Sequence, residues 1–134
     1  MFDSHIHMMK EVQKETFFHH INWEFNSGGV LFISIGTDRY DRKNLEIDSY
    51  SDLFRVETRV RKDGWEISYK IPYEFLRKYF PCFKIREGDK MRGNFYKCAD
   101  KAKSPHYGCW ADIDLPEPDF HCPKFFGDLV LESV

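Results

Sequence analysis

Two runs of alternating residues on either side of a tight turn constrain the fold of this chain most strongly. Over residues 54–61, apolar or threonine side chains at even positions alternate with charged side chains at odd positions. Over residues 65–71 the odd positions are apolar or aromatic and the even positions polar. Between the runs stands Lys62-Asp63-Gly64, and Asp-Gly is a strong hairpin signal. Because alternate residues of a strand face opposite sides, the pattern predicts an antiparallel β-hairpin with one buried face.

Further strands are expected elsewhere in the chain. Phe17 to Asn26 and Val30 to Ile35 flank the glycine-rich turn 27–29 and predict a second hairpin. Strands are also expected over 91–98 and 129–131, and a short helix over 72–80 that begins at a proline. Residues 1–16 lack clear periodicity and are expected to be irregular. The sequence therefore predicts an all-β chain folded as an antiparallel β-sandwich of the immunoglobulin-like kind, with one short helix.

Size and composition exclude several classes of protein. At 134 residues the chain is expected to form a single domain with a real core. Its formal net charge of -2 gives no electrostatic reason to expect nucleic acid or an anionic membrane as partner. Aromatic residues make up 17% of the chain, which suits sandwich cores and flat binding platforms. The N-terminus lacks the features of a signal peptide, so we expect a cytoplasmic protein as written, and an extracellular or periplasmic one if the native N-terminus is longer.

Cysteine and histidine spacing does not predict a metal site. The four cysteines form no Cys-x-x-Cys pair, which argues against a zinc knuckle; their even number permits disulfides without implying them. The histidine pairs 5/7 and 19/20 lack a third nearby ligand. A calcium cluster of Asp112, Asp114 and Asp119 is conceivable, although these residues lack the spacing of an EF-hand loop. His121 is expected to be a packed, hydrogen-bonded residue that closes its loop. The cysteines are Cys82, Cys98, Cys109 and Cys122.

The last third of the chain carries large aromatic residues in a polar loop. Trp110 is the first candidate for a ligand contact, because an indole can stack on the apolar C–H face of a sugar ring. A tryptophan that packs at the rim of the core is the alternative. Tyr107 is a weaker companion in the same loop, since tyrosines near loop prolines often only pack.

Two pairs of polar residues are expected to project from single strand faces. Arg92 and Asn94 alternate on one strand, and a guanidinium with an amide suits vicinal hydroxyls. Glu24 and Asn26 alternate on another, with Asn22 completing the row. Such a row lines a groove or simply faces water. The candidate site residues are thus Trp110, Asn94, Arg92, Tyr107, Glu24 and Asn26.

A series of short motifs occurs in a fixed order along the chain. The motifs are Asn22-Trp23-Glu24-Phe25-Asn26, Trp65-Glu66-Ile67 with Ile71-Pro72, Arg92-Gly93-Asn94-Phe95-Tyr96-Lys97, Trp110, Pro118-Asp119-Phe120-His121 and Phe125-Phe126-Gly127. Together they resemble the family 9 carbohydrate-binding modules and the related family 9-like proteins of bacteria. The resemblance covers residues 17–132 and implies a DOMON-related jelly-roll sandwich. It also implies non-catalytic binding of plant-type polysaccharide or oligosaccharide ends, of the xylan or cellulose kind, in a module that accompanies glycoside hydrolases. Structural calcium is known in that family, and no other cofactor is implied.

The family-like domain is expected over residues 17–134. The resemblance also implies that N-terminal strands of the usual family domain are missing from it. A sandwich without them would expose apolar edges, which a homodimer would cover. We expect no enzyme, because no pair of carboxylates, nucleophile elbow or phosphate loop stands in a recognisable catalytic setting. The alternative function is a structural or interaction domain that keeps the sandwich and has lost sugar binding.

Overall fold

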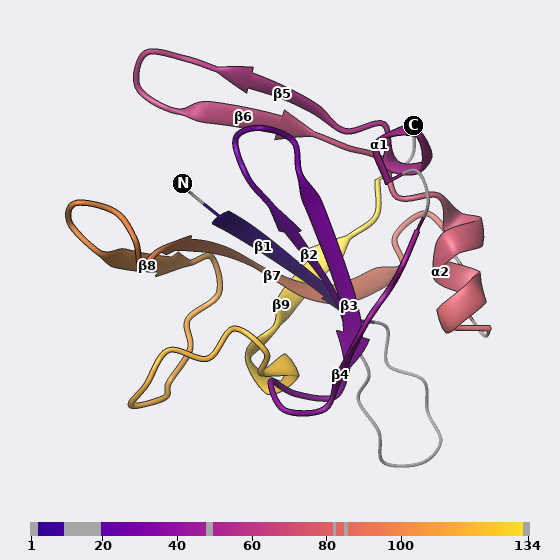
Figure 1. Cartoon of the computed structure of the whole chain (residues 1–134). Helices are drawn as coiled ribbons and strands as arrows, with labels where there is room; N and C mark the ends of the chain where they lie inside the picture. The colour runs from indigo at the N-terminus through magenta and orange to yellow at the C-terminus, as the bar shows by residue number, and fades with distance from the viewer. Residues whose placement is uncertain (1–2, 10–19, 48–49, 82, 85, 133–134) are drawn as a thin grey trace.

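The computed structural model describes residues 3–9, 20–47, 50–81, 83–84 and 86–132, and these form strands, two α-helices and a 3-10 turn (Figure 1). The strands are β1 (Asp3–Met9), β2 (His20–Phe25), β3 (Leu31–Gly36), β4 (Arg42–Asn44), β5 (Glu57–Val60), β6 (Trp65–Ser68), β7 (Lys90–Ala99), β8 (His106–Cys109) and β9 (Gly127–Val130). The helices are α1 (Tyr50–Phe54), α2 (Tyr73–Tyr79) and the 3-10 helix η1 (Pro123–Phe125).

One large antiparallel sheet organises the molecule. Its strand order is β4-β3-β2-β1-β7-β8, and β9 also pairs with β7, beyond the stretch that pairs with β8. The hairpin β5–β6 forms a separate sheet, which lies with α1 and α2 over one side of the large sheet (Figure 1). The predicted antiparallel β-sandwich is therefore confirmed, with helices completing its smaller layer.

The core lies between these two layers. We call the covered side of the large sheet the inner face; from β2 it receives Ile21, Trp23 and Phe25, each at most 1% exposed. Phe54 at the end of α1 meets Phe75 of α2 edge-on, with ring centroids 5.0 Å apart. The remaining apolar core comes from β3, β6, β7 and α2, including Leu31, Ile33, Trp65, Ile67, Leu76 and Met91. Because strand residues alternate, the opposite side of β2, the outer face, receives His20, Asn22 and Glu24.

The prediction that residues 1–16 are irregular is wrong for residues 3–9. They form β1, which pairs with β2 on one side and with β7 on the other, in the middle of the sheet. Asp3 and Ser4 are poor strand formers, so local propensity does not reveal a strand that two long-range pairings specify. Of the strand expected over residues 17–26, residues 17–19 lie outside the described residues. β2 forms most of the remainder, from His20 to Phe25.

The expected strand over residues 54–61 is shorter than its alternation suggests. Phe54 ends α1, and only Glu57 to Val60 form β5. Phe54 points its ring into the core at the end of a helix, while its carbonyl oxygen accepts the Lys70 N–H at 2.6 Å. Tertiary packing therefore overrides the period-two pattern at this end. The short strands β4 and β8 were not predicted, because all their side chains are exposed and give no apolar alternation.

Both predicted hairpin turns and the helix α2 are confirmed. Val60 pairs with Trp65 across the turn 61–64. Phe25 pairs with Leu31 across the turn 26–30, in which Gly29 has φ +78°. No helix in the described parts of the chain is long and apolar enough to span a membrane.

Candidate functional site

Polar side chains gather on the outer face over β2, β3 and β4, where the strand register sets them in rows. Glu24 lies opposite Phe32, Asn22 opposite Ser34 and then Asn44, and His20 opposite Gly36 and then Arg42. Leu31 and Ile33 belong to the core, so the residues between and after them face outward. We call this surface the polar face; it comprises His20, Asn22, Glu24, Phe32, Ser34, Arg42 and Asn44.

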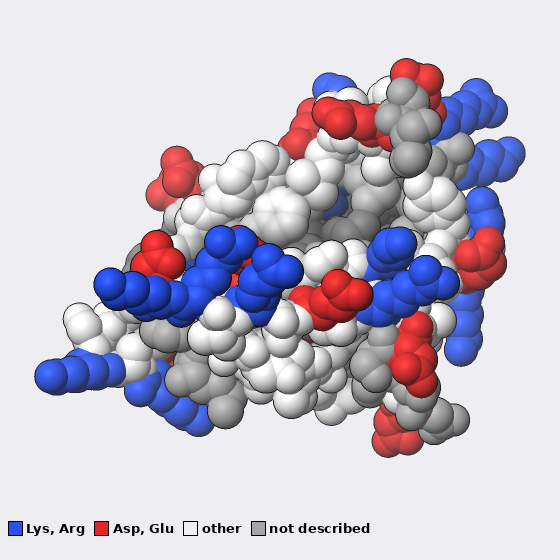
Figure 2. All heavy atoms as spheres, turned by 90° about the horizontal axis from the view of Figure 1, so that it is seen from above, with Lys and Arg blue, Asp and Glu red and all other residues white. Residues whose placement is uncertain are grey.

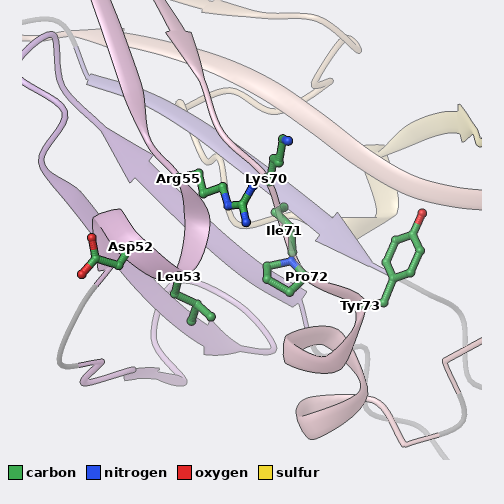
Figure 3. A pocket seen from close by; sticks show the side chains of 7 residues that line it. All are labelled: Asp52, Leu53, Arg55, Lys70, Ile71, Pro72 and Tyr73. Carbon is green, nitrogen blue, oxygen red and sulfur yellow. The ribbon is translucent and has the colours of Figure 1, made fainter. Parts of the chain in front are cut away.

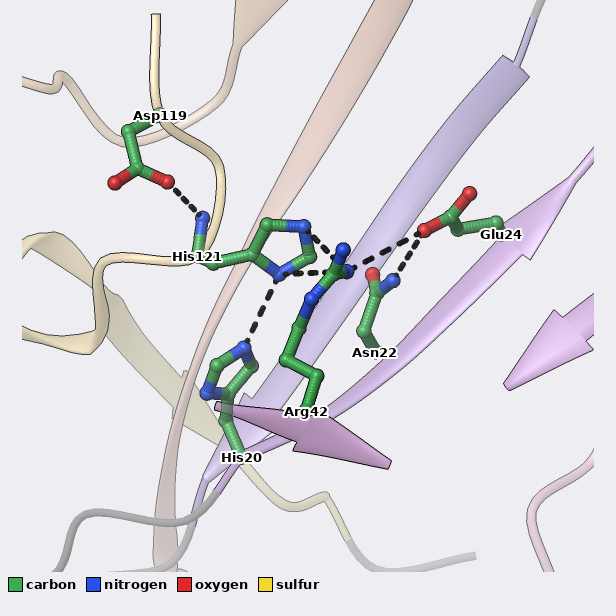
Figure 4. A network of polar contacts seen from close by, with 6 residues as sticks. All are labelled: His20, Asn22, Glu24, Arg42, Asp119 and His121. Carbon is green, nitrogen blue, oxygen red and sulfur yellow. Dashed lines mark hydrogen bonds and ion pairs between the residues drawn. The ribbon is translucent and has the colours of Figure 1, made fainter. Parts of the chain in front are cut away.

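Glu24 and Arg42 are the charged residues of the polar face. The Asn22 Nδ2 donates to Glu24 Oε1 at 2.6 Å, and Arg42 Nη1 lies 3.9 Å from the same oxygen (Figure 4). The two charged side chains are 29% and 28% exposed, so each is reachable by a ligand while partly shielded from water. Electrostatic contacts in such a setting are stronger than those of fully exposed pairs.

The loop before η1 forms a wall beside the polar face through His121. Arg42 Nη1 lies 2.7 Å from His121 Nε2, and His121 Nδ1 lies 3.4 Å from His20 Nε2 (Figure 4). A guanidinium can only donate, so His121 Nε2 accepts from Arg42. The backbone N–H of His121 donates to Asp119 Oδ1 at 2.9 Å. The expectation of a packed, hydrogen-bonded His121 is confirmed.

His20 is held in its neutral form by this environment. Burial first and the Arg42 guanidinium second lower the pKa of its imidazole from 6.5 to about 4, against smaller opposing effects of Asp119 and Asp38. Arg42 is therefore the cationic group of the polar face at neutral pH.

Within the part of the chain that the structure describes, two buried side-chain oxygens of the polar face have no hydrogen-bond partner. These are the side-chain oxygens Asn22 Oδ1 and Ser34 Oγ, and the two residues face each other across β2 and β3. Their residues are 0% and 1% exposed. An unsatisfied buried polar atom costs about 1–3 kcal/mol, so this part of the sheet has hydrogen-bonding capacity that none of the described residues uses.

Of the residues predicted from sequence, Asn94, Arg92 and Asn26 hold backbone groups. Asn94 is fully buried; its Oδ1 accepts the N–H of Ala111 at 2.8 Å and its Nδ2 donates to the Ala111 oxygen at 2.8 Å. Arg92 donates to the backbone oxygen of Phe126 at 2.7 Å. Asn26 Oδ1 accepts two backbone N–H groups of the β2–β3 turn. All three thus position loops, while Glu24 is the predicted residue that the structure places in the polar face.

The two predicted aromatic residues lie on opposite faces of the sheet. Tyr107 pairs with Cys98 on the outer face, is 51% exposed, and lines a pocket of about 250 Å³ with the loop 113–120. Trp110 is 54% exposed and meets Phe95 edge-on at 5.7 Å. A Cβ atom added at Gly127 would lie 2.7 Å from Trp110 Cζ3, so this glycine lets the indole pack closely against β9. The structure therefore does not bring Trp110 together with Glu24.

Sequence reasoning missed Phe32, Ser34 and Arg42. Phe32 was detectable, because the alternation of β3 that buries Leu31 and Ile33 turns it outward. Arg42 gave no signal, since it belongs to a three-residue exposed strand. Within the described residues, no three His, Cys, Asp or Glu side chains are grouped so that they could hold a metal ion, and Cys109 and Cys122 form no disulfide.

Comparisons with known proteins agree with the fold and with the motif order. The family model of carbohydrate-binding family 9 matches residues 2–131. A crystal structure of a provisionally assigned carbohydrate-binding protein from Bacteroides uniformis ATCC 8492 superposes with a TM-score of 0.69 at 26% sequence identity. The match covers 98% of this chain and 61% of that one. A search of curated proteins found no match. Because the family model matches nearly its whole length, the chain belongs to carbohydrate-binding family 9.

Proposed function

We propose that the chain is a non-catalytic carbohydrate-binding module that holds its ligand on the polar face. Family membership supports sugar as the ligand class. The observation that carries the location is the half-buried pair of Glu24 and Arg42, with the exposed ring of Phe32 directly opposite Glu24 in the ladder.

The chemistry of this surface suits a sugar. A carboxylate accepts hydrogen bonds and a guanidinium donates them, so Glu24 and Arg42 together complement vicinal hydroxyls, which do both. Asn22 supports Glu24 from below, because its Nδ2 donates to Glu24 Oε1. Phe32 is 40% exposed and offers an apolar ring to the C–H face of a pyranose.

The position of the polar face on an open sheet surface favours an extended, β-linked chain of the xylan or cellulose kind as ligand. Phe32 and Glu24 lie opposite each other in one row and offer a ring and a carboxylate, while the next row, Ser34 and Asn22, is buried. Among the residues that define the polar face, Glu24 is the single carboxylate, and it lies beside the cation Arg42. Glycosidases instead use two facing carboxyl groups, and this difference supports binding without hydrolysis.

Calorimetric titration with xylohexaose and cellohexaose tests the proposal. We expect Glu24→Gln and Phe32→Ala each to weaken binding by about tenfold or more, which corresponds to the loss of one charged hydrogen bond or one ring contact. Glu57→Gln is the matched control for Glu24, because Glu57 is exposed on β5 and far from the polar face in the fold. Phe95→Ala is the control for Phe32, since both rings are 40% exposed and Phe95 packs beside Trp110 instead.

The controls also separate the competing accounts. Loss of binding in Trp110→Ala and Phe95→Ala, with Phe32→Ala unaffected, would move the site to the indole on the other side of the sheet. Absence of heat with every oligosaccharide in a broad panel would instead favour an interaction domain that has lost sugar binding.

A further inference from the structure

A second hollow lies on the helix side of the molecule, where α1 ends and α2 begins (Figure 3). Its volume is about 520 Å³, and it shares no residue with the polar face. Its lining residues are Asp52, Leu53, Arg55, Lys70, Ile71, Pro72 and Tyr73. We call it the helix-side pocket.

Arg55 has a backbone conformation that is unusual for an arginine. It directly follows α1 and has φ +48°, the left-handed region in which helices usually place glycine or asparagine. For other residues this conformation costs about 1 kcal/mol. In this conformation Arg55 places its guanidinium in the pocket, where Figure 3 shows it beside Ile71 and Pro72.

The pocket gathers two cations that have no acidic partner. Among the described residues, neither Arg55 nor Lys70 makes a side-chain hydrogen bond or ion pair. The Lys70 N–H donates to the Phe54 oxygen at 2.6 Å, which fixes the two cation-bearing segments against each other. The Asp52 carboxylate points away from Arg55 (Figure 3).

Apolar surface surrounds these cations. Leu53 is 39% exposed and Tyr73 47% exposed, and Ile71 and Pro72 are half-buried. Seen from the side of the β5–β6 hairpin, Lys and Arg side chains form a band broken by acidic ones (Figure 2). Such a site fits a compact ligand with an apolar body and one anionic group.

We propose that the helix-side pocket binds the carboxylate of an acidic sugar, a uronate, with Arg55 and Lys70 holding the carboxylate and Tyr73 and Pro72 contacting the ring. The guanidinium fork matches a carboxylate in geometry, and the ammonium of Lys70 adds a second charge. The choice of a sugar as carrier of the carboxylate rests on the proposed function, whereas the anion site itself rests on the pocket alone.

Titration of the whole chain with D-glucuronate, D-glucose and inorganic phosphate tests the proposal. We expect D-glucuronate to bind, more weakly at higher salt, and D-glucose not to bind in this pocket. Arg55→Gly should weaken D-glucuronate binding about tenfold or more, the effect of losing a charged hydrogen bond. This variant keeps the fold, because glycine adopts the left-handed conformation without strain. Lys70→Gln should weaken binding in the same direction.

Arg59→Gln is the matched control, because Arg59 is an exposed cation of β5 that does not line the pocket. An equal loss in Arg59→Gln and Arg55→Gly would overturn the proposal in favour of diffuse charge attraction. Phosphate that binds as tightly as D-glucuronate would overturn the sugar class of the ligand. The two proposals fail separately: D-glucuronate binding should survive Glu24→Gln, and neutral oligosaccharide binding should survive Arg55→Gly. Absence of D-glucuronate binding in a chain that binds xylohexaose would refute the pocket alone.

Discussion

Glu24 and Asn94 show how similar polar residues on the outer face come to serve different purposes. Both are strand residues that alternate with core residues. Asn94 is fully buried beneath the loop 111–122 and completes the backbone hydrogen bonds of Ala111. Glu24 lies on β2 beside Arg42, which contacts His121 of that loop, and it stays partly exposed. The fate of each side chain thus depends on what the C-terminal loop covers.

His20 makes stability depend on pH. Its pKa is 6.5 in the unfolded chain and about 4 in the folded one, because burial and Arg42 disfavour the charged ring. The unfolded chain therefore binds the proton more readily, so the stabilisation is complete above about pH 6.5 and is lost as the pH falls toward 4. We expect the free energy of unfolding to fall by up to about 3 kcal/mol across this range. Denaturant unfolding at several pH values measures it.

His20→Gln should flatten this pH profile, because the group that titrates is then absent. His106→Gln is the matched control; His106 is exposed on β8, and its removal should leave the slope unchanged. A wild-type profile with the same slope as that of His20→Gln would show that His20 does not carry the effect.

At the scale of elements, the polar face depends on how closely β4 approaches β3. Gly36 lies opposite Arg42 in the ladder. A Cβ atom at position 36 would lie 1.9 Å from the backbone oxygen of Asp41 and 2.7 Å from Arg42 Cα. Only glycine lets the two strands meet at this place, and their meeting is what brings Arg42 over β3 toward Glu24 and His121.

Gly36→Ala should therefore push β4 away from β3 and displace Arg42. We expect a loss of stability of about 1–3 kcal/mol, typical of overpacking, together with weaker oligosaccharide binding. Thermal unfolding and calorimetric titration measure the two effects. Gly64→Ala is the control, since nothing lies within 4 Å of a Cβ atom there. Equal behaviour of the two variants would mean that β4 tolerates a side chain at this position.

The sequence predicted those elements whose local pattern agrees with their burial. The two hairpins were found because their turns carry glycine and their strands alternate, and α2 because Pro72 begins it. β1 was missed, since its place between β2 and β7 is set by pairing with distant strands. β4 and β8 were missed because exposed strands show no apolar alternation.

At the scale of the whole molecule, the large sheet separates two chemistries. Its inner face joins the core with α1, α2 and the β5–β6 hairpin, and its outer face carries the polar face and the C-terminal loop (Figure 1). Sequence analysis found Glu24 but grouped it with Trp110, which lies on the other side of the sheet next to Phe95. Distance along a chain does not show which face of a sheet a loop residue joins, so this part of the site needed the structure.

Chemical-shift mapping during titration with xylohexaose tests the central claim, that sugar binds the polar face. Amide signals of the described residues of β2, β3 and β4, and of Asp119 to His121 beside them, should shift in proportion to saturation. Signals of β8 and β9 and the indole N–H of Trp110 should stay in place. Shifts centred on Trp110, Phe95 and Gly127, with the signals of β2 to β4 unmoved, would contradict the account.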